Sequence, residues 1–259
     1  MKPSLRFLLL FCASLGLAGS LAAQSAPPTA LRLTNSAATG LDYSTGKYGF
    51  SDSTEVYSVP LDLSHESGAW IWRANFSYLT IKGPATVIGG GGAARPTSNT
   101  ESGFGDIYLG GAYRFGETLG KWNLDVSARV KLPTASEARG LGTGETDLYG
   151  QVDLYRSFGT VTPFFSAGWR EFGNSAQYPL HSGVYASAGV HFRLSETTLL
   201  ITSLNWGEYL IAGEDDTTDA LVAVSHDVNE KWRAMVYALA GFTDASPDLA
   251  LGLRATYRF

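Results

Sequence analysis

The chain has 259 residues, a formal net charge of −5 and 30 glycines, so glycine makes up about 12% of it where about 7% is usual. No basic patch dominates the sequence, which argues against a nucleic-acid partner. No long apolar run follows residue 17, which excludes an inner-membrane protein built from helices.

Residues 1–23 have the pattern of a secretory signal peptide. Lys2 and Arg6 form a cationic head, residues 7–17 are apolar, and residues 20–23 offer small side chains for cleavage. The apolar run is too short for a membrane-spanning helix, which takes about 20 residues. Cleavage would remove the single cysteine, Cys12, and change the net charge from −5 to −7. The mature protein would then have neither disulfides nor thiol chemistry.

The rest of the chain reads as a periplasmic lead-in over 24–37, followed by strands over 38–259. The two-residue alternation of apolar and polar side chains predicts about twelve strands. The clearest lie at 106–115, 122–131, 184–194, 232–242 and 249–259. The weaker ones lie at 38–46, 54–64, 70–81, 146–158, 161–171, 198–207 and 218–227.

The last strand, 249–259, carries the most information. Leu253, Tyr257 and Phe259 share an apolar face, while Arg254 and Arg258 share the opposite, cationic face. A tilted strand of about 9–11 residues can cross a bilayer. The pattern also resembles the carboxy-terminal signal of bacterial outer-membrane proteins, in which a final Phe is read by the barrel-insertion machinery.

These patterns predict an all-β protein: one closed antiparallel transmembrane barrel of about twelve strands in contact with outer-membrane lipid. The alternative is a soluble β-sandwich or a lipocalin-like barrel, which would bury its tryptophans inside. Short connections alternate with longer ones, and an even strand count would leave both chain ends in the periplasm.

Three residues fit the strands less well. Pro60 falls in the middle of a strand, where a bulge is the available explanation, and Pro163 falls at a strand start. Arg156 would face lipid near the rim, where its long side chain can reach the headgroups.

Aromatic residues fall at the predicted strand ends, as they do at both interfaces of membrane barrels. The predicted periplasmic ring contains Trp70, Trp122, Trp232, Tyr257 and Phe259, and the predicted outer ring contains Trp169 and Trp206.

Charged side chains at inward positions are the candidate lumen-lining residues. The cations are Arg73, Arg114, Arg129, Lys131, Arg170, Arg193, Arg233, Arg254 and Arg258, and the anions are Asp42, Asp62, Asp106, Asp125, Asp147, Asp153, Asp219 and Asp227. They can line a route that attracts anionic solutes, or they can pair across neighbouring strands. The near balance of signs favours pairing, because an unpaired charge in a poorly hydrated lumen is costly.

Two predicted loops are candidates for a role in binding or in narrowing the pore. The glycine-rich loop 82–105 can fold inward and narrow the pore or can be a mobile outer loop, and it lacks the residues of a phosphate-binding loop. Glu214, Asp215 and Asp216, with Asp219, could bind a hard cation, but calcium-loop spacing is absent and a solvated acidic loop is favoured. We expect neither a metal nor a cofactor.

An enzymatic site is not expected. Ser225, His226 and Asp227 are consecutive on a strand, so their side chains face alternate sides and cannot form a triad. His191 and Ser187 face the same side, but four residues of strand separate them by about 13 Å.

Three stretches resemble the outer-membrane barrels grouped under the meta-pathway of phenol degradation. They are TGKYG at 45–49, SGFGDI at 102–107, and KLPT at 131–134 followed by GTG at 142–144 and Asp147. Ala135 stands where that family often has Gly. The resemblance implies uptake of small, aromatic or apolar molecules, and it supplies no functional residues.

The sequence therefore favours a passive channel or transporter for small-molecule solutes. A structural or adhesive barrel with a plugged lumen is the alternative, and a lipid-modifying outer-membrane enzyme is a third class.

Overall fold

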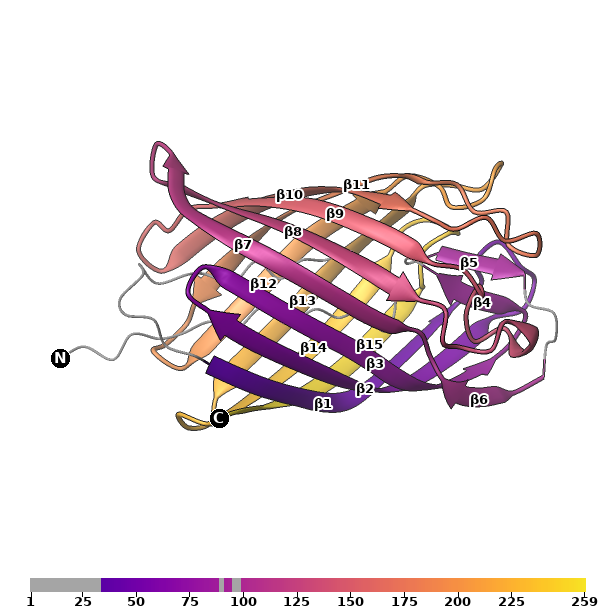
Figure 1. Cartoon of the computed structure of the whole chain (residues 1–259), viewed down its shortest axis with the longest axis horizontal. Coiled ribbons are helices and arrows are strands. Elements are labelled where there is room, and N and C mark those ends of the chain that lie inside the picture. The colour runs from indigo at the N-terminus through magenta and orange to yellow at the C-terminus, as the bar shows by residue number, and fades with distance from the viewer. Residues whose placement is uncertain (1–33, 89–90, 95–98) are drawn as a thin grey trace.

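The computed structural model describes residues 34–88, 91–94 and 99–259. The predicted signal peptide and residues 24–33 of the lead-in lie outside the described residues. The described chain forms one closed barrel of twelve long antiparallel strands, which confirms the predicted fold class (Figure 1).

Each predicted strand corresponds to one strand of the barrel wall. These are β1 (Thr34–Gly46), β2 (Thr54–Ser67), β3 (Trp70–Lys82), β7 (Ile107–Leu119), β8 (Trp122–Leu132), β9 (Asp147–Tyr155), β10 (Val161–Glu171), β11 (Gly183–Arg193), β12 (Thr198–Gly207), β13 (Thr217–Asp227), β14 (Trp232–Gly241) and β15 (Leu249–Arg258). The connection between β3 and β7 contains β4 (Ala85–Ile88), β5 (Gly91–Ala94) and β6 (Glu101–Phe104), and that between β8 and β9 contains a 3-10 helix, η1 (Glu137–Arg139).

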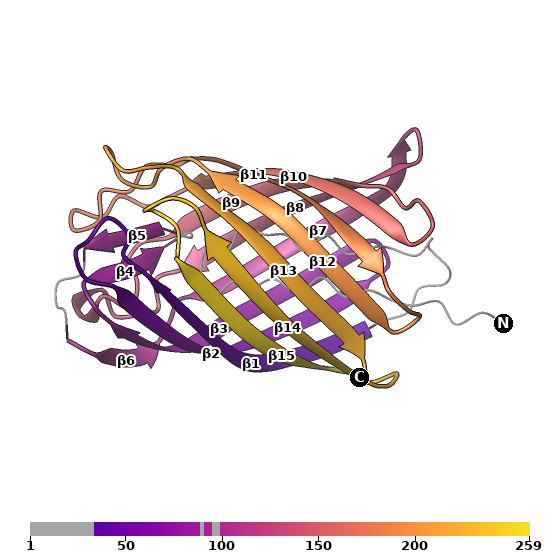
Figure 2. The same ribbon diagram turned by 180° about the vertical axis from the view of Figure 1, so that it is seen from behind.

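The first and last strands close the barrel. β1 pairs with β15 from Ser36↔Arg258 to Thr45↔Leu249, and it pairs with β2 on its other side. Figure 2 shows this seam, where β15 lies beside β1. Each of the twelve long strands in the described barrel wall therefore has a partner on both sides, as a strand in hydrocarbon requires.

The connections differ in length at the two ends of the barrel. At the turn end, β7 and β8 are joined by Gly120 and Lys121 alone, both with positive φ, as a two-residue hairpin requires. At the loop end the connections are longer, as predicted. The chain enters β1 and leaves β15 at the turn end (Figure 1).

Side-chain exposure alternates along the strands and confirms the predicted phase. In β14, for example, Trp232 and Val236 are exposed outside the barrel, whereas Arg233 and Met235 are buried inside it. The outward tryptophans Trp70 and Trp232 are 47% and 46% exposed, which contradicts the soluble alternative with tryptophans inside.

The predicted loop 82–105 is largely structured. β4 and β5 form a hairpin, and β6 continues the barrel wall beside β3. The pairs Tyr78↔Phe104 and Asn75↔Tyr108 differ in register by one residue, so β6 and β7 are two parts of one wall strand separated by a bulge at residues 105–107. A bulge redirects side chains, and here both Gly105 and Asp106 are buried.

Pro60 does not cause the bulge that the sequence suggested. β1 and β2 skip the pairs beside Pro60 but keep their register, from Thr39↔Leu61 to Asp42↔Ser58. The Thr39 hydroxyl donates a hydrogen bond to the Pro60 carbonyl at 2.8 Å, so a side chain contacts the backbone where the ladder is interrupted.

Several strand boundaries also differ from the prediction: β2 runs to Ser67 instead of 64, and β7 to Leu119 instead of 115. β1 begins at Thr34, because residues 34–37 pair with residues 63–66 of β2. β9 ends at Tyr155, and Arg156 lies in the turn that follows, its guanidinium 4.8 Å from the centre of the Phe158 ring, instead of in a strand facing lipid.

Within the described residues, no helix is long and apolar enough to cross a membrane.

Candidate functional site

The inner face of the barrel is the candidate functional site, because its side chains contact anything that enters the lumen. The structure places every predicted lumen residue on the inward side. These residues are Asp42, Asp62, Arg73, Asp106, Arg114, Asp125, Arg129, Lys131, Asp147, Asp153, Arg170, Arg193, Asp219, Asp227, Arg233, Arg254 and Arg258.

A buried polar group lies inside the seam between the first and last strands. Arg254 donates to both oxygens of Asp42, at 2.5 and 2.7 Å, and its Nε lies 3.7 Å from Asp62. The Tyr237 hydroxyl also donates to Asp42, at 2.7 Å, and the Asn75 amide donates to Asp62. The charges here are paired, as an ion pair out of water requires.

A second group of charges lies near the turn end. Arg233 contacts both oxygens of Asp227, at 2.7 and 2.9 Å, and Arg258 donates to the same carboxylate. Arg114 lies 3.1 Å from Glu66 of β2. Arg233 and Asp227 lie on neighbouring strands, whereas Arg258 and Arg114 each reach an acid two strands away. These pairs support the pairing interpretation over an array of cations.

A third group surrounds Lys131. Its ammonium lies 2.6 Å from Asp147 and 3.6 Å from Asp106, and it donates to the Thr143 hydroxyl at 2.6 Å. The Ala135 amide donates to Asp106 at 2.9 Å. These residues come from two of the three stretches that resemble the phenol-pathway barrels, so the structure brings separate motifs into one buried cluster.

Rings and guanidinium groups alternate along the inner wall of β7 to β10. The Arg129 guanidinium lies 4.2 Å from the centre of the Tyr149 ring and 4.9 Å from that of Tyr108. Arg170 lies 5.6 Å from the centre of the Phe172 ring and donates to the backbone carbonyl of Glu208. Cation–π contacts of this kind stabilise a guanidinium group that is removed from water.

Two inward carboxylates have neutral partners. Asp153 accepts hydrogen bonds from Gln151 at 2.8 Å and Ser166 at 2.5 Å. Asp219 accepts one from Asn205 at 2.6 Å. Hydrogen-bonded acids therefore interrupt the cationic positions, and neither sign of charge dominates the polar part of the inner face.

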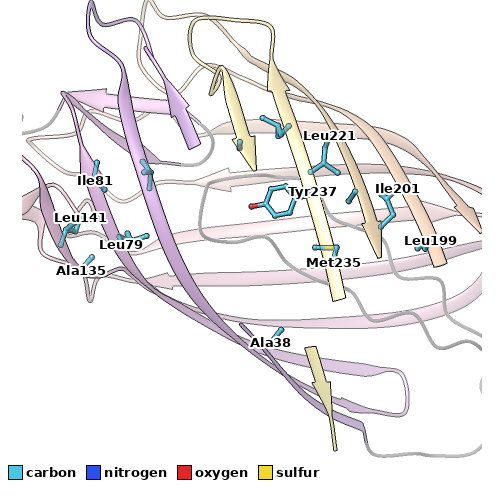
Figure 3. Packing of buried hydrophobic residues seen from close by; sticks show 14 residues of the cluster. Ala38, Leu79, Ile81, Ala135, Leu141, Leu199, Ile201, Leu221, Met235 and Tyr237 are labelled. Carbon is cyan, nitrogen blue, oxygen red and sulfur yellow. The ribbon is translucent and has the colours of Figure 1, made fainter. Parts of the chain in front are cut away.

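The middle of the inner face of β12 to β14 is apolar, which the sequence analysis did not single out. Leu221 pairs in register with Leu239, and Ile201 with Ala223, all on the inward side. Figure 3 shows Leu199, Ile201, Leu221 and Met235 on one side of the lumen. We call this surface the apolar wall; its residues are Leu199, Ile201, Leu221, Ala223, Met235 and Leu239. The sequence contained the information needed to predict the apolar wall, because these apolar residues fall at inward positions of the predicted strands.

The aromatic residues of the predicted rings lie outside the barrel. Trp232 contacts Tyr257, with ring centres 5.0 Å apart, and Tyr257 stacks on Phe259 at 6.0 Å. Trp70 stacks on Trp72, which the sequence analysis left out of the ring. The positions of the full set follow the strand ends: Trp70, Trp122, Trp232, Tyr257 and Phe259 at the turn end, Trp169 and Trp206 at the loop end.

The acidic loop and the apparent triad have other roles. Asp216 accepts hydrogen bonds from the Trp206 indole at 3.0 Å and the Tyr209 amide at 2.9 Å. Among the described residues, no group of acids, histidines and cysteines is arranged to hold a metal ion. His226 contacts Thr198 at 2.9 Å, while Asp227 pairs with arginines inside the barrel, so the three consecutive residues do not assemble.

The connections at the loop end pack on one another. Tyr178 and Phe172 contact Leu210 of the next connection in a small apolar cluster. Tyr48, in the connection between β1 and β2, is also buried, and this burial raises the pKa of its hydroxyl. Such contacts hold the loops in fixed positions over the barrel.

Comparison with known proteins supports the architecture. No protein-family model and no curated protein matches the sequence. The fold is similar to that of an outer membrane channel from Pseudomonas putida F1, with a TM-score of 0.70 and 14% identity over 91% of this chain and 99% of that chain. It is also similar to the beta domain of the Bordetella autotransporter BrkA, with a TM-score of 0.52 and 12% identity over 88% and 100%. The shared feature is the fold of bacterial outer-membrane β-barrels.

Proposed function

We propose that this protein is a passive channel of the bacterial outer membrane for small molecules that carry an aromatic or apolar part. The apolar outer surface and the closed ladder suit a bilayer, and the two sets of outer aromatic residues suit its two interfaces. The name of the similar Pseudomonas structure, an outer membrane channel, adds support, as does the resemblance to the phenol-pathway barrels.

The observation that carries this proposal is the two-sided lumen. Paired charges and hydrogen-bonded acids lie on the inner face of β7 to β10, and the apolar wall occupies the middle of the inner face of β12 to β14, between the Asn205–Asp219 and Arg233–Asp227 contacts. A small solute with one polar and one apolar side can contact both surfaces. A lumen lined by polar groups alone would favour sugars and ions instead.

Liposome swelling with sugars, organic acids and phenols tests the proposal. We expect phenols and other small aromatic compounds to enter faster than sugars of similar size. Replacing Leu221 and Leu239 by Ser should reduce this preference, because it makes the apolar wall polar, while small-ion conductance stays unchanged. Equal entry of sugars and phenols before and after the substitution would exclude the aromatic preference.

Single-channel recording separates a channel from a plugged barrel. We expect reproducible open steps, and we expect Arg129→Ala and Arg233→Ala to shift conductance or ion selectivity, since both cations lie inward. A folded wild-type protein that shows no conductance would instead favour the structural or adhesive role.

A further inference from the structure

We infer that residues 133–146, called here the inward loop, form the constriction that sets the size limit of the lumen, and that Lys131 is the residue that positions this loop. The inference rests on the proposed channel function and adds the element that selects solutes by size.

The inward loop packs against the inner surface at the barrel mouth, reaching β3, which lies two strands away from β8. Ala135 and Leu141 are buried in one cluster with Leu79 and Ile81, which are inward side chains of β3 (Figure 3). A methyl group added at Gly103, on the inner side of β6, would lie 2.8 Å from Leu141. The loop therefore folds from β8 over the inner side of the neighbouring wall, formed by β6, β7 and β3, instead of extending outward.

Lys131 ties both halves of the loop to the wall. Its ammonium donates directly to Thr143, near the end of the loop, at 2.6 Å. It also lies 3.6 Å from Asp106, whose other oxygen accepts the amide of Ala135 near the start of the loop. Side-chain exposures of 2% for Lys131 and 1% for Asp147 place the hub out of solvent. Buried, charge-assisted contacts of this kind are strong.

The bulge in the wall makes this geometry possible. It turns Asp106 inward, so that the carboxylate reaches Lys131. Gly142 then approaches this carboxylate closely, since a methyl group at Gly142 would lie 2.7 Å from Oδ2 of Asp106. A larger residue at 142 would force the loop away from the hub.

Further contacts fix the middle of the loop. The Thr86 hydroxyl of β4 donates to the Gly140 carbonyl at 2.9 Å, and Arg139 contacts Glu101 of β6 at 2.8 Å. Ser175, in the next connection, donates to Glu137 at 3.3 Å. The loop is held from three sides, so it is a fixed constriction and not a mobile flap.

Shortening the loop tests the constriction directly. Lys131 and Asp147 are register partners of β8 and β9, so residues 133, 134, 145 and 146 can join the strands after deletion of 135–144. We expect the shortened protein to show a conductance about two-fold or more higher, and to admit larger neutral sugars in swelling assays, because conductance and size limit follow the narrowest section.

Point variants test Lys131 as the positioning residue. Lys131→Met should raise the conductance and the size limit toward those of the shortened protein, and Thr143→Val should do so partly. Lys82→Met is the matched control, because the Lys82–Glu55 pair also lies near the loop end but is solvent-exposed; it should leave both values unchanged. If Lys131→Met fails to fold, the triple variant Lys131→Met, Asp106→Asn and Asp147→Asn takes its place in the experiment. The triple variant removes the three buried charges together, so none of them is left without a partner.

The outcomes separate this inference from the proposed function. If the wild type conducts, and deletion of 135–144 changes neither its conductance nor its size limit, the inward loop is not the constriction. The proposed channel function would still stand. If the shortened protein widens the lumen but neither Lys131→Met nor the triple variant does, Lys131 is not the positioning residue. If neither wild type nor shortened protein conducts, the channel function itself is wrong. If the wild type shows no conductance and the shortened protein conducts, the result supports the inward loop as the element that obstructs the lumen.

Discussion

Asp42 and Arg254 join the first and last strands of the barrel through two contacts of 2.5 and 2.7 Å, although 212 residues separate them in the sequence. Both side chains are almost completely buried, with exposures of 0% and 1%. The pair therefore crosses the one junction in the barrel whose strands are not connected by a turn or loop.

Breaking this pair should destabilise the barrel. Asp42→Ala leaves a buried guanidinium without its main acid, which costs about 3–5 kcal/mol of unfolding free energy. Urea unfolding in detergent micelles, followed by tryptophan fluorescence, measures the change. Lys82→Met breaks an exposed pair, with side-chain exposures of 63% and 33%, and should change the free energy by no more than about 1 kcal/mol. Equal effects of the two variants would contradict a special role of the seam pair.

The ring of Tyr237 occupies the space over Gly252 of the neighbouring strand. A methyl group at Gly252 would lie 2.2 Å from Cε1 of this ring, so Gly252→Ala should displace the ring and cost about 1–3 kcal/mol. Gly150→Ala is the matched control, because nothing lies within 4 Å of its added methyl group. The same unfolding experiment compares them, and indistinguishable stabilities would show that the ring does not need this space.

The carboxy-terminal Phe259 should matter for assembly more than for stability. If the insertion machinery reads the last strand, Phe259→Ala should lower the amount of folded barrel in cell envelopes but leave refolding in detergent intact. Phe242→Ala is a fair control, since Phe242 and Phe259 are similarly exposed, at 64% and 65%. Heat-modifiable migration on gels reports the folded fraction. A loss that is the same for both variants would count against recognition through Phe259.

The Thr39 hydroxyl should stabilise the interrupted ladder at Pro60. Thr39→Val removes the donor to the Pro60 carbonyl and should cost about 0.5–1.5 kcal/mol, whereas Thr39→Ser keeps the hydroxyl and should cost less. Unfolding of both variants in micelles gives the difference. If valine is tolerated as well as serine, this hydrogen bond contributes nothing to stability.

The strand pattern could be predicted because a two-residue period is a strong local signal. In β8, for instance, Trp122 and Val126 alternate with Asp125 and Arg129, and no tertiary contact changes which face each side chain takes. The inward charges at positions such as 233 and 254 followed from the same alternation. The pairing of charges was expected from their balance of signs, but the particular partners depend on strand register.

The inward loop, the β4–β5 hairpin, the bulge and the apolar wall could not be predicted in this way, because they depend on contacts that the two-residue alternation does not reveal. The inward loop is held by single hydrogen bonds to Lys131, Thr86 and Ser175, which come from three separate segments. The hairpin of β4 and β5 lies in a glycine-rich stretch that lacks the two-residue alternation of a strand. The bulge beside Asp106 adds one residue to the strand, and the local amino-acid composition does not reveal it. Each residue of the apolar wall lies at an inward position of the predicted alternation. The wall was not predicted, because the interior of such a barrel was expected to be polar.

The bulge at residues 105–107 makes the chain length at this point matter more than the identity of most residues nearby. Deleting one residue there would bring β6 and β7 into a common register and leave their side chains on their present faces, because Gly105 and Asp106 both lie on the inner side. Inserting one more residue would instead turn β6 or β7 over, so that inner side chains met lipid and outer ones met the lumen. Natural variants of this barrel should therefore tolerate substitutions along the wall more readily than a single-residue insertion beside Asp106.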